Sequence, residues 1–186
     1  MLMAALEYKK MLVYFSTCSV NDPELVATPY VNHKKKMEEL VQTARNFAIF
    51  RLPQVVGRTE NPNTLTNYLY QHINSGSHFQ VWRNATRNLI DVEDVVSIAT
   101  HLIRRHLVNG ITTNIACPFS ISIPQLVSVF ELVLDKKANS TVVEAGGSYL
   151  IDTLMATSAA KEIGIDFDDA YIEKLIRKYY GKRLPL

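Results

Sequence analysis

Short apolar segments rich in β-branched and aromatic residues alternate along this chain with longer segments of helical periodicity, and this alternation restricts the fold more than any other feature. The strand-like segments are residues 12–16, 48–52, 79–82, 113–117 and 141–144. The helical segments are 29–46, 92–106, a segment that begins at Ser122, and 168–180. Strands that alternate with helices pair in parallel, so the sequence predicts an α/β fold built on a parallel sheet.

Two of the predicted helices carry specific start signals. Pro29 suits the first turn of a helix, where its missing N–H costs nothing. Ser122 is followed by an early proline and, three residues on, by Gln125, which is the pattern of a capping box. Helices are therefore expected to begin at these two places.

The composition is that of an ordinary globular protein and excludes several classes of function. The chain has 186 residues, of which 47% are hydrophobic and 20% charged, with a net charge of +2. This length suits one domain, or one domain with a small lobe. The near-neutral charge and scattered basic residues argue against a nucleic-acid partner. No segment is long and apolar enough to cross a bilayer, and Met1–Leu6 is too short for a secretory signal, so we expect a cytoplasmic protein with no membrane partner.

Metal-ligand spacing is absent from the sequence. The two cysteines, Cys18 and Cys117, lie in apolar strand-like segments, and the five histidines are scattered. Buried, reduced thiols are the expected state of both cysteines. No metal site is predicted.

Tyr30 and Lys34 are four residues apart in a segment that should begin a helix. That spacing puts a phenol and an ammonium on one helical face, where the cation favours the phenolate form. A tyrosine placed in this way can act as a general acid/base. The same spacing also occurs on solvated amphipathic surfaces, so the pair alone leaves both interpretations open.

Hydroxyl groups follow the first strand-like segment, at Ser16, Thr17 and Ser19. The carboxyl ends of strands are where open α/β sheets place their ligands. These hydroxyls could therefore face the same cleft as Tyr30 and Lys34. A hydroxyl at a strand end can equally cap a turn.

At these residues the chain resembles the extended short-chain dehydrogenase/reductase family, which comprises NAD(P)-dependent nucleotide-sugar epimerases, dehydratases and reductases. Four segments carry the resemblance in the expected order, and a fifth resembles the late part of the family before its closing helix. They are residues 13–20, Tyr30 with Lys34, residues 50–57, residues 87–96, and residues 152–165.

The resemblance implies a division into two parts. Residues 1–57 and 89–117 would be the C-terminal portion of a Rossmann-like parallel sheet, and residues 58–88 and 118–186 a small α/β lobe that grips a nucleotide sugar. NAD or NADP is the implied cofactor. The sequence leaves open which of the two it is, and which sugar and base the substrate carries.

The chain departs from the family at the glycine-rich turn that holds the cofactor pyrophosphate. No such turn occurs in the sequence, and Gly146-Gly147 follows no strand-turn-helix pattern. We therefore expect the chain to correspond to the C-terminal two-thirds of such an enzyme, with residues 1–8 as the end of a helix. We also expect it to bind NAD(P) only weakly by itself.

The family implies a role for each candidate residue. Tyr30 would exchange a proton with a sugar oxygen, Lys34 would support it and bind the nicotinamide ribose, and the Thr17 hydroxyl would bond the reacting oxygen. The implied cofactor contacts are Ser16, Tyr30, Lys34, Pro53, Val55 and Val56. The implied substrate contacts are Ser19, Gln54, Asn63, Arg83 and Arg87, with Arg87 matching an arginine that holds the nucleotide diphosphate.

The residues after Thr17 bear on the type of reaction. Laid on the dehydratase pattern S-T-D-E-V, residues 16–20 put Cys18 and Ser19 where dehydratases carry an acid and a base. Neither replacement can do that work at neutral pH. The resemblance therefore favours epimerisation or keto-sugar reduction, and the short link of twelve residues between Thr17 and Tyr30 favours a reductase slightly.

A second hypothesis is a non-catalytic remnant that binds a nucleotide sugar or a protein partner. A sheet that starts at residues 11–16 would leave an apolar strand edge unpaired, and such edges invite association. We accordingly expect a homo-oligomer, or association through this edge.

Overall fold

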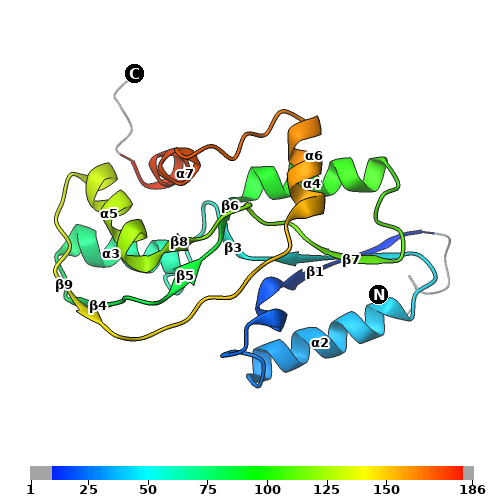
Figure 1. Ribbon diagram of the computed structural model, residues 1–186, viewed down its shortest axis with the longest axis horizontal. Coiled ribbons are helices and arrows are strands. Elements are labelled where there is room, and N and C mark those ends of the chain that lie inside the picture. Colours follow the sequence, from blue (N-terminus) through cyan, green and yellow to red (C-terminus); the bar gives the residue numbers. More distant parts are fainter. Residues whose placement is uncertain (1–9, 182–186) are drawn as a thin grey trace. The chain divides into compact units, whose positions relative to one another are not determined.

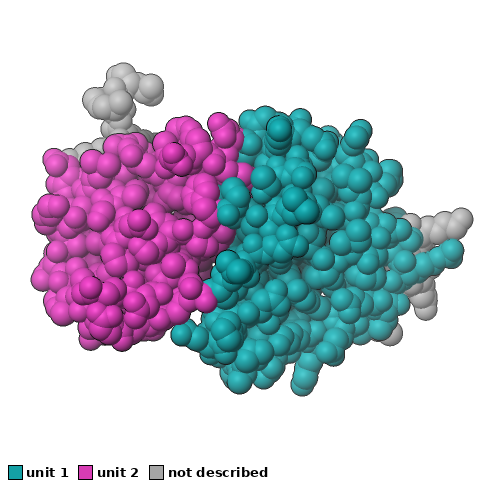
Figure 2. All heavy atoms as spheres, viewed as in Figure 1, with its two compact units in different colours: residues 1–53, 93–118, 149–165 teal, residues 54–92, 119–148, 166–186 magenta. Residues whose placement is uncertain are grey.

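The computed structural model describes residues 10–181, and the helix end predicted at residues 1–8 lies outside the described residues (Figure 1). The chain folds into two compact units, coloured teal and magenta in Figure 2. Unit 1 comprises residues 1–53, 93–118 and 149–165, and unit 2 comprises residues 54–92, 119–148 and 166–186.

Unit 1 is built on a parallel sheet of three strands. Within the described residues their order is β1 (Leu12–Thr17), β2 (Phe47–Leu52) and β7 (Ile111–Asn114), so β1 and β7 are the outer strands. β1 and β2 pair from Leu12 opposite Phe47 to Thr17 opposite Leu52. The predicted parallel α/β fold is confirmed.

Helices cover both faces of this sheet. Figure 1 shows α2 (Pro29–Gln42) on one side, with α4 (Val92–Arg104) and α6 (Leu154–Glu162) on the other. Thr28 caps α2 through its side chain, and Pro29 stands in the first turn as predicted. Between β1 and α2 lies the short 3-10 helix η1 (Cys18–Asn21). Apolar side chains from the sheet, α2 and α4 form the core, among them Val31, Ile49, Phe50, Ile98 and Leu102.

The described residues of unit 2 form three two-stranded sheets and three helices. β3 (Gln54–Val56) pairs in parallel with β6 (Leu89–Asp91), β4 (Phe79–Trp82) pairs in parallel with β9 (Ser140–Val143), and β5 (Thr86–Arg87) pairs antiparallel with β8 (Ile121–Ser122). The helices are α3 (Leu65–Ser75), α5 (Ile123–Leu134) and α7 (Tyr171–Tyr180). Their buried residues include Leu69, Leu126, Phe130 and Ile176.

Polar contacts fix two of these helices. The capping box predicted for α5 is present, because Ser122 and Gln125 bind each other's backbone N–H groups. α7 is held by the buried carboxylate of Asp91 in β6, which accepts hydrogen bonds from Lys178 at 2.7 Å and from the Tyr179 hydroxyl at 2.8 Å. α7 is thereby fastened to the strand that precedes α4.

Several element boundaries differ from the prediction. α2 ends at Gln42 rather than at residue 46, and α4 ends at Arg104 rather than at residue 106. α7 begins at Tyr171 rather than at residue 168, because Asp168 forms a capped turn in front of it. The strand predicted at residues 113–117 is β7 at 111–114. Residues 115–117 are buried but lie beyond the end of β7, although the Ile115 N–H still bonds to the Arg51 carbonyl of β2.

The compact units also divide the chain differently from the predicted domains. Residues 149–165, assigned above to the substrate lobe, lie in unit 1, where α6 packs near β7 and the Asn114 side chain donates to the Asp152 carbonyl at 2.9 Å. β3 and β6 lie in unit 2. Across residues 10–181, no helix combines the length and the apolar character needed to cross a membrane.

Candidate active site

The three predicted catalytic residues all belong to unit 1, at the carboxyl end of β1 and the start of α2. Thr17 is the last residue of β1 and is buried. Its Oγ1 accepts a hydrogen bond from the Ser19 backbone N–H at 3.2 Å, which caps η1. The threonine therefore does cap a turn. Its own O–H can still donate a hydrogen bond to a ligand oxygen.

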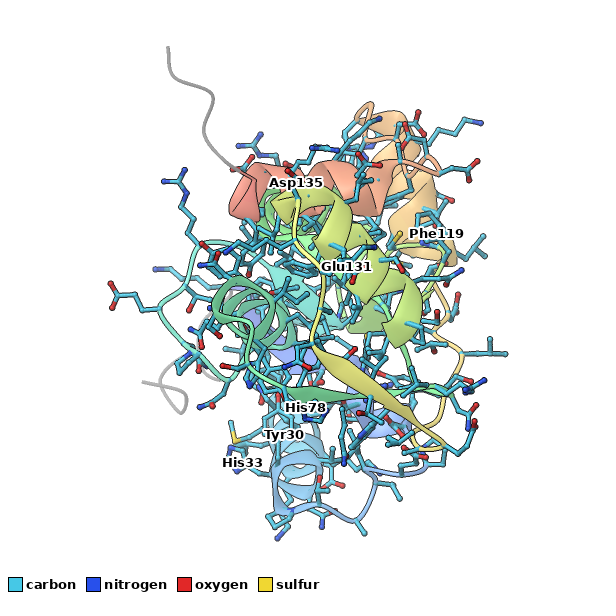
Figure 3. All side chains as sticks on the ribbon, turned by 90° about the vertical axis from the view of Figure 1, so that its left-hand side faces the viewer. Tyr30, His33, His78, Phe119, Glu131 and Asp135 are labelled. Carbon is cyan, nitrogen blue, oxygen red and sulfur yellow. The ribbon has the colours of Figure 1, made fainter. Side chains whose placement is uncertain are left out.

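Tyr30 and Lys34 lie side by side on α2, as their spacing predicts. The Lys34 Nζ is 5.9 Å from the centre of the Tyr30 ring and 5.1 Å from the centre of the Tyr14 ring. Tyr30 is 57% exposed, and Figure 3 shows it on α2. Its hydroxyl has no hydrogen-bond partner within the described part of the chain. A phenol with an adjacent cation is thus open to a ligand.

Lys34 also contacts the outer edge of the sheet. Its Nζ donates to the Phe15 carbonyl at 3.2 Å. In a parallel ladder, alternate residues of a strand bond to one neighbour. Because the Leu12 N–H bonds to Asn46 beside β2, the Phe15 carbonyl faces the other, open edge of β1. The ammonium therefore satisfies a carbonyl on an edge of β1 that no strand of the described residues pairs.

The hydroxyl of Ser16, a predicted cofactor contact, points toward α2. It donates to the Glu38 carboxylate, which also accepts from Arg51 Nε at 3.0 Å and from Arg51 Nη2 at 2.6 Å. Glu38 is 4% exposed. Ser16 is thus part of a buried network, and a cofactor contact through its hydroxyl stays a prediction.

Cys18 and Ser19 follow Thr17 in η1. The Cys18 thiol is 1% exposed and lies 3.3 Å from the Arg51 carbonyl oxygen. Burial raises the pKa of this thiol from 9.0 to about 12, against a smaller opposing effect of the Arg51 charge. A thiol with so high a pKa is too weak an acid to replace the acid of a dehydratase.

The remaining predicted contacts lie in unit 2, except Pro53, which ends the first segment of unit 1. Gln54 is exposed in β3, Val55 is half-buried beside it, and Val56 is buried. Asn63 is exposed in the loop before α3, and its N–H donates to the Asn61 side chain. The surroundings of these residues do not point to a particular ligand.

Arg87 lines a pocket of about 480 Å³ in unit 2. Its Nη1 donates to the neighbouring Thr86 carbonyl, which leaves other guanidinium donors without a partner in the described residues. The pocket is walled by residues of α3, β4, β5 and the start of α5, namely Leu65, Tyr68, Leu69, Gln80, Trp82, Ala85, Arg87 and Ile123. Apolar and aromatic walls with one charged fork suit a ligand that has a planar ring and an anionic group.

Arg83 does not line this pocket. It forms an exposed ion pair with Glu144, with 2.7 Å between Nε and Oε1. The Trp82 side chain lines the pocket and is 45% exposed.

Glu38 and Arg51 were missed by sequence reasoning, although both left signals. Glu38 follows Lys34 by one helical turn, and Arg51 interrupts the apolar strand 47–52, where a charge needs a partner. Residues 10–181 contain no group of acidic, histidine or cysteine side chains that could hold a metal ion.

Several solved structures have the fold of this chain. The UDP-glucuronic acid 4-epimerase of Bacillus cereus, solved with UDP-glucuronic acid and NAD, is 17% identical with a TM-score of 0.78, over 96% of this chain and 63% of that one. The RMD protein of Pseudomonas aeruginosa, complexed with NADPH, is 15% identical with a TM-score of 0.67, over 94% and 66%. The NAD-dependent NDP-hexosamine 5,6-dehydratase TunA, from tunicamycin biosynthesis, is 20% identical with a TM-score of 0.69, over 90% and 61%.

The chain thus spans less than two thirds of each of these proteins. No curated protein matches its sequence. A model of the NAD dependent epimerase/dehydratase family matches residues 1–116, which is more than half of the chain. The chain therefore belongs to the NAD dependent epimerase/dehydratase family.

Proposed function

We propose that this chain carries the proton-transfer site and the substrate subsite of an NAD(P)-dependent nucleotide-sugar epimerase or keto-sugar reductase. The observation that carries the proposal is the pairing of Tyr30 with Lys34, 5.9 Å from ring centre to Nζ, together with the Lys34 bond to the Phe15 carbonyl, two residues before Thr17 ends β1. Family membership and the nucleotide-sugar enzymes of the same fold support it.

The donors present suit the nicotinamide end of a dinucleotide. Lys34 offers an ammonium and Tyr30 a hydroxyl, and both can bind ribose oxygens. When bound, NAD(P) would supply the hydride acceptor or donor. No glycine-rich turn in this sequence offers a place for the pyrophosphate.

The protein's own part is proton transfer at the substrate oxygen. In its phenolate form, Tyr30 would accept the proton of a sugar hydroxyl as that carbon loses hydride, and it would return the proton when hydride is delivered back. The Lys34 ammonium would stabilise the phenolate, and the Thr17 O–H would donate to the same sugar oxygen. The buried thiol of Cys18, with a pKa of about 12, argues against dehydration.

The substrate would bind through its nucleotide in the unit 2 pocket. Arg87 offers a planar pair of donors to the diphosphate, and Tyr68 and Trp82 offer ring faces to the base. This assignment predicts that UDP alone binds to the chain.

The test supplies the chain with NAD⁺ and UDP-glucuronic acid and looks for the 4-epimer, and in parallel supplies NADPH and a 4-keto nucleotide sugar and follows absorbance at 340 nm. We expect turnover in one assay, with a loss of about 100-fold or more in Tyr30→Phe. Tyr14→Phe is the matched control, because Tyr14 also faces the Lys34 ammonium. Absence of turnover in both assays would contradict the proposal.

One observation favours the second candidate, a binding module without catalysis. Within the described residues β1 is an outer strand that pairs with β2 alone, and its Phe15 side chain is 47% exposed. This edge could pair with a second copy or another chain. Fluorescence titration with NADH and NADPH, calorimetry with UDP, and sedimentation over a range of concentrations separate the two. UDP binding and self-association without dinucleotide binding would favour the module.

A further inference from the structure

Glu38 is a buried carboxylate that has no role in the proposed reaction. It lies on α2 and is 4% exposed, with three hydrogen bonds from two side chains. Arg51 binds both of its oxygens through Nε and Nη2, and Ser16 donates to Oε1. Because both oxygens are engaged, this carboxylate is poorly placed to exchange protons with a substrate.

The partners of Glu38 come from two neighbouring strands at the same level. Ser16 of β1 and Arg51 of β2 are directly opposed in the parallel register. Ser16 is followed at once by Thr17, whose side chain lies on the opposite face of the strand. The carboxylate therefore ties α2 to the ends of both strands, one residue before the hydroxyl at position 17.

Along α2, Glu38 lies one turn after Lys34 and two turns after Tyr30. Residues four apart share a helical face, so the helix meets the sheet through Glu38 on the side that carries the tyrosine and the lysine. A bidentate ion pair has a fixed geometry, unlike a contact between apolar side chains, which can slide. The network thus fixes both the rotation and the height of α2 against β1.

We propose that Glu38 is a positioning residue that sets the Tyr30 and Lys34 face of α2 against the carboxyl ends of β1 and β2. This inference deepens the proposed function and rests on it, since it concerns the placement of Tyr30 and Lys34. All of the contacts that carry it lie within unit 1.

The test compares Glu38→Gln with Glu39→Gln in the full chain. Glutamine keeps the shape of Glu38 but lacks the charge, and its amide donors oppose those of Arg51. Glu39 is the matched control, because it is the next residue of the same helix and is exposed. The chain has nine tyrosines, so 3-fluorotyrosine labelling gives a ¹⁹F spectrum in which Tyr30 is assigned by the signal lost in Tyr30→Phe.

We expect Glu38→Gln to shift or broaden the Tyr30 signal while it leaves the signals of Tyr171 and Tyr179 in unit 2 unchanged. Glu39→Gln should leave all of them unchanged. Binding of UDP, measured by calorimetry, should be equal in the three proteins, because the proposed pocket lies in unit 2. A Tyr30 signal that is the same in both folded variants would overturn the inference.

Ser16→Ala covers the case in which Glu38→Gln does not fold, since it removes one hydrogen bond and keeps the ion pair. We expect a smaller displacement of the Tyr30 signal in Ser16→Ala than in Glu38→Gln. An unchanged Tyr30 signal in Ser16→Ala would overturn the inference. In turnover assays with UDP-glucuronic acid and NAD⁺, we expect Glu38→Gln to lower kcat by about 10- to 100-fold with KM unchanged. If the wild type shows no turnover, the proposed function fails, and the Tyr30 signal still decides whether Glu38 holds the helix.

Discussion

The ammonium of Lys34 donates a hydrogen bond to the Phe15 carbonyl at 3.2 Å, so one side chain serves both the open edge of β1 and the face of α2 that bears Tyr30. An edge carbonyl is exposed to water or to another strand when no side chain covers it. Here the cation satisfies the carbonyl and is kept beside the phenol. The lysine therefore has a structural role, measured by the free energy of unfolding, and a proposed chemical role, measured by turnover.

Lys34→Ala should separate these two roles. Loss of a partly exposed hydrogen bond should lower the free energy of unfolding by about 0.5–1.5 kcal/mol. Turnover should fall by about 100-fold or more, because the phenolate of Tyr30 loses its cation. Urea denaturation and the epimerisation assay measure the two effects. The control is Lys36→Ala, an exposed residue two positions on. Equal turnover in both variants would show that Lys34 acts only on the edge.

Arg87→Ala should weaken the binding of UDP without unfolding unit 2. A charge-assisted bond to a phosphate is worth about 1.5–3 kcal/mol, so calorimetry should show a loss of affinity of about 10-fold or more. Arg87→Lys should lie between this variant and the wild type, since an ammonium keeps the charge but loses the fork.

Arg83→Ala is the comparison for this prediction. Its exposed pair with Glu144 lies outside the pocket lining, so its loss should change UDP affinity little. An equal loss of affinity in both arginine variants would mean that the anion site is not at Arg87.

The sequence predicted those parts of the fold that depend on local chemistry. Pro29 and the Ser122 capping box begin helices where expected, and the strand-like segments at 12–16 and 48–52 are neighbouring parallel strands. α6 was not predicted, because it has only nine residues and no wide apolar face. β5 and β8 have two residues each, which is too short to show a period.

At the candidate site, the sequence located the residues on each element but not their partners. The spacing of Tyr30 and Lys34 was enough to place them together on one helix. The Ser16 hydroxyl was expected at the cofactor, but it donates to Glu38, which lies 22 residues away in the sequence. Such a contact depends on strand register and helix rotation, which a single sequence does not specify.

Asp91→Ala should release α7 from β6. The substitution leaves the Lys178 ammonium and the Tyr179 hydroxyl without their shared acceptor. Because Asp91 is buried while Lys178 is partly exposed, we expect a loss of about 1–3 kcal/mol in the free energy of unfolding, measured by urea denaturation. Asp169→Ala, at an exposed position before α7, should cost far less. A similar small effect of both variants would show that α7 is held by its apolar face alone.

The Cys18 thiol should make the protein less stable at alkaline pH. Its pKa is about 12 in the folded chain and 9.0 when unperturbed, so above pH 9 the unfolded thiol loses its proton while the folded one keeps it. The unfolded state then binds fewer protons, and the stability contributed by Cys18 is complete below pH 9 and lost as the pH rises toward 12. Between pH 9 and 10.5, the free energy of unfolding should fall by about 2 kcal/mol more in the wild type than in Cys18→Ala, since each pH unit is worth about 1.4 kcal/mol. Urea denaturation at a series of pH values measures the difference, in which the titration of all other groups cancels. Parallel pH profiles for the two proteins would show that this thiol is not protected by burial.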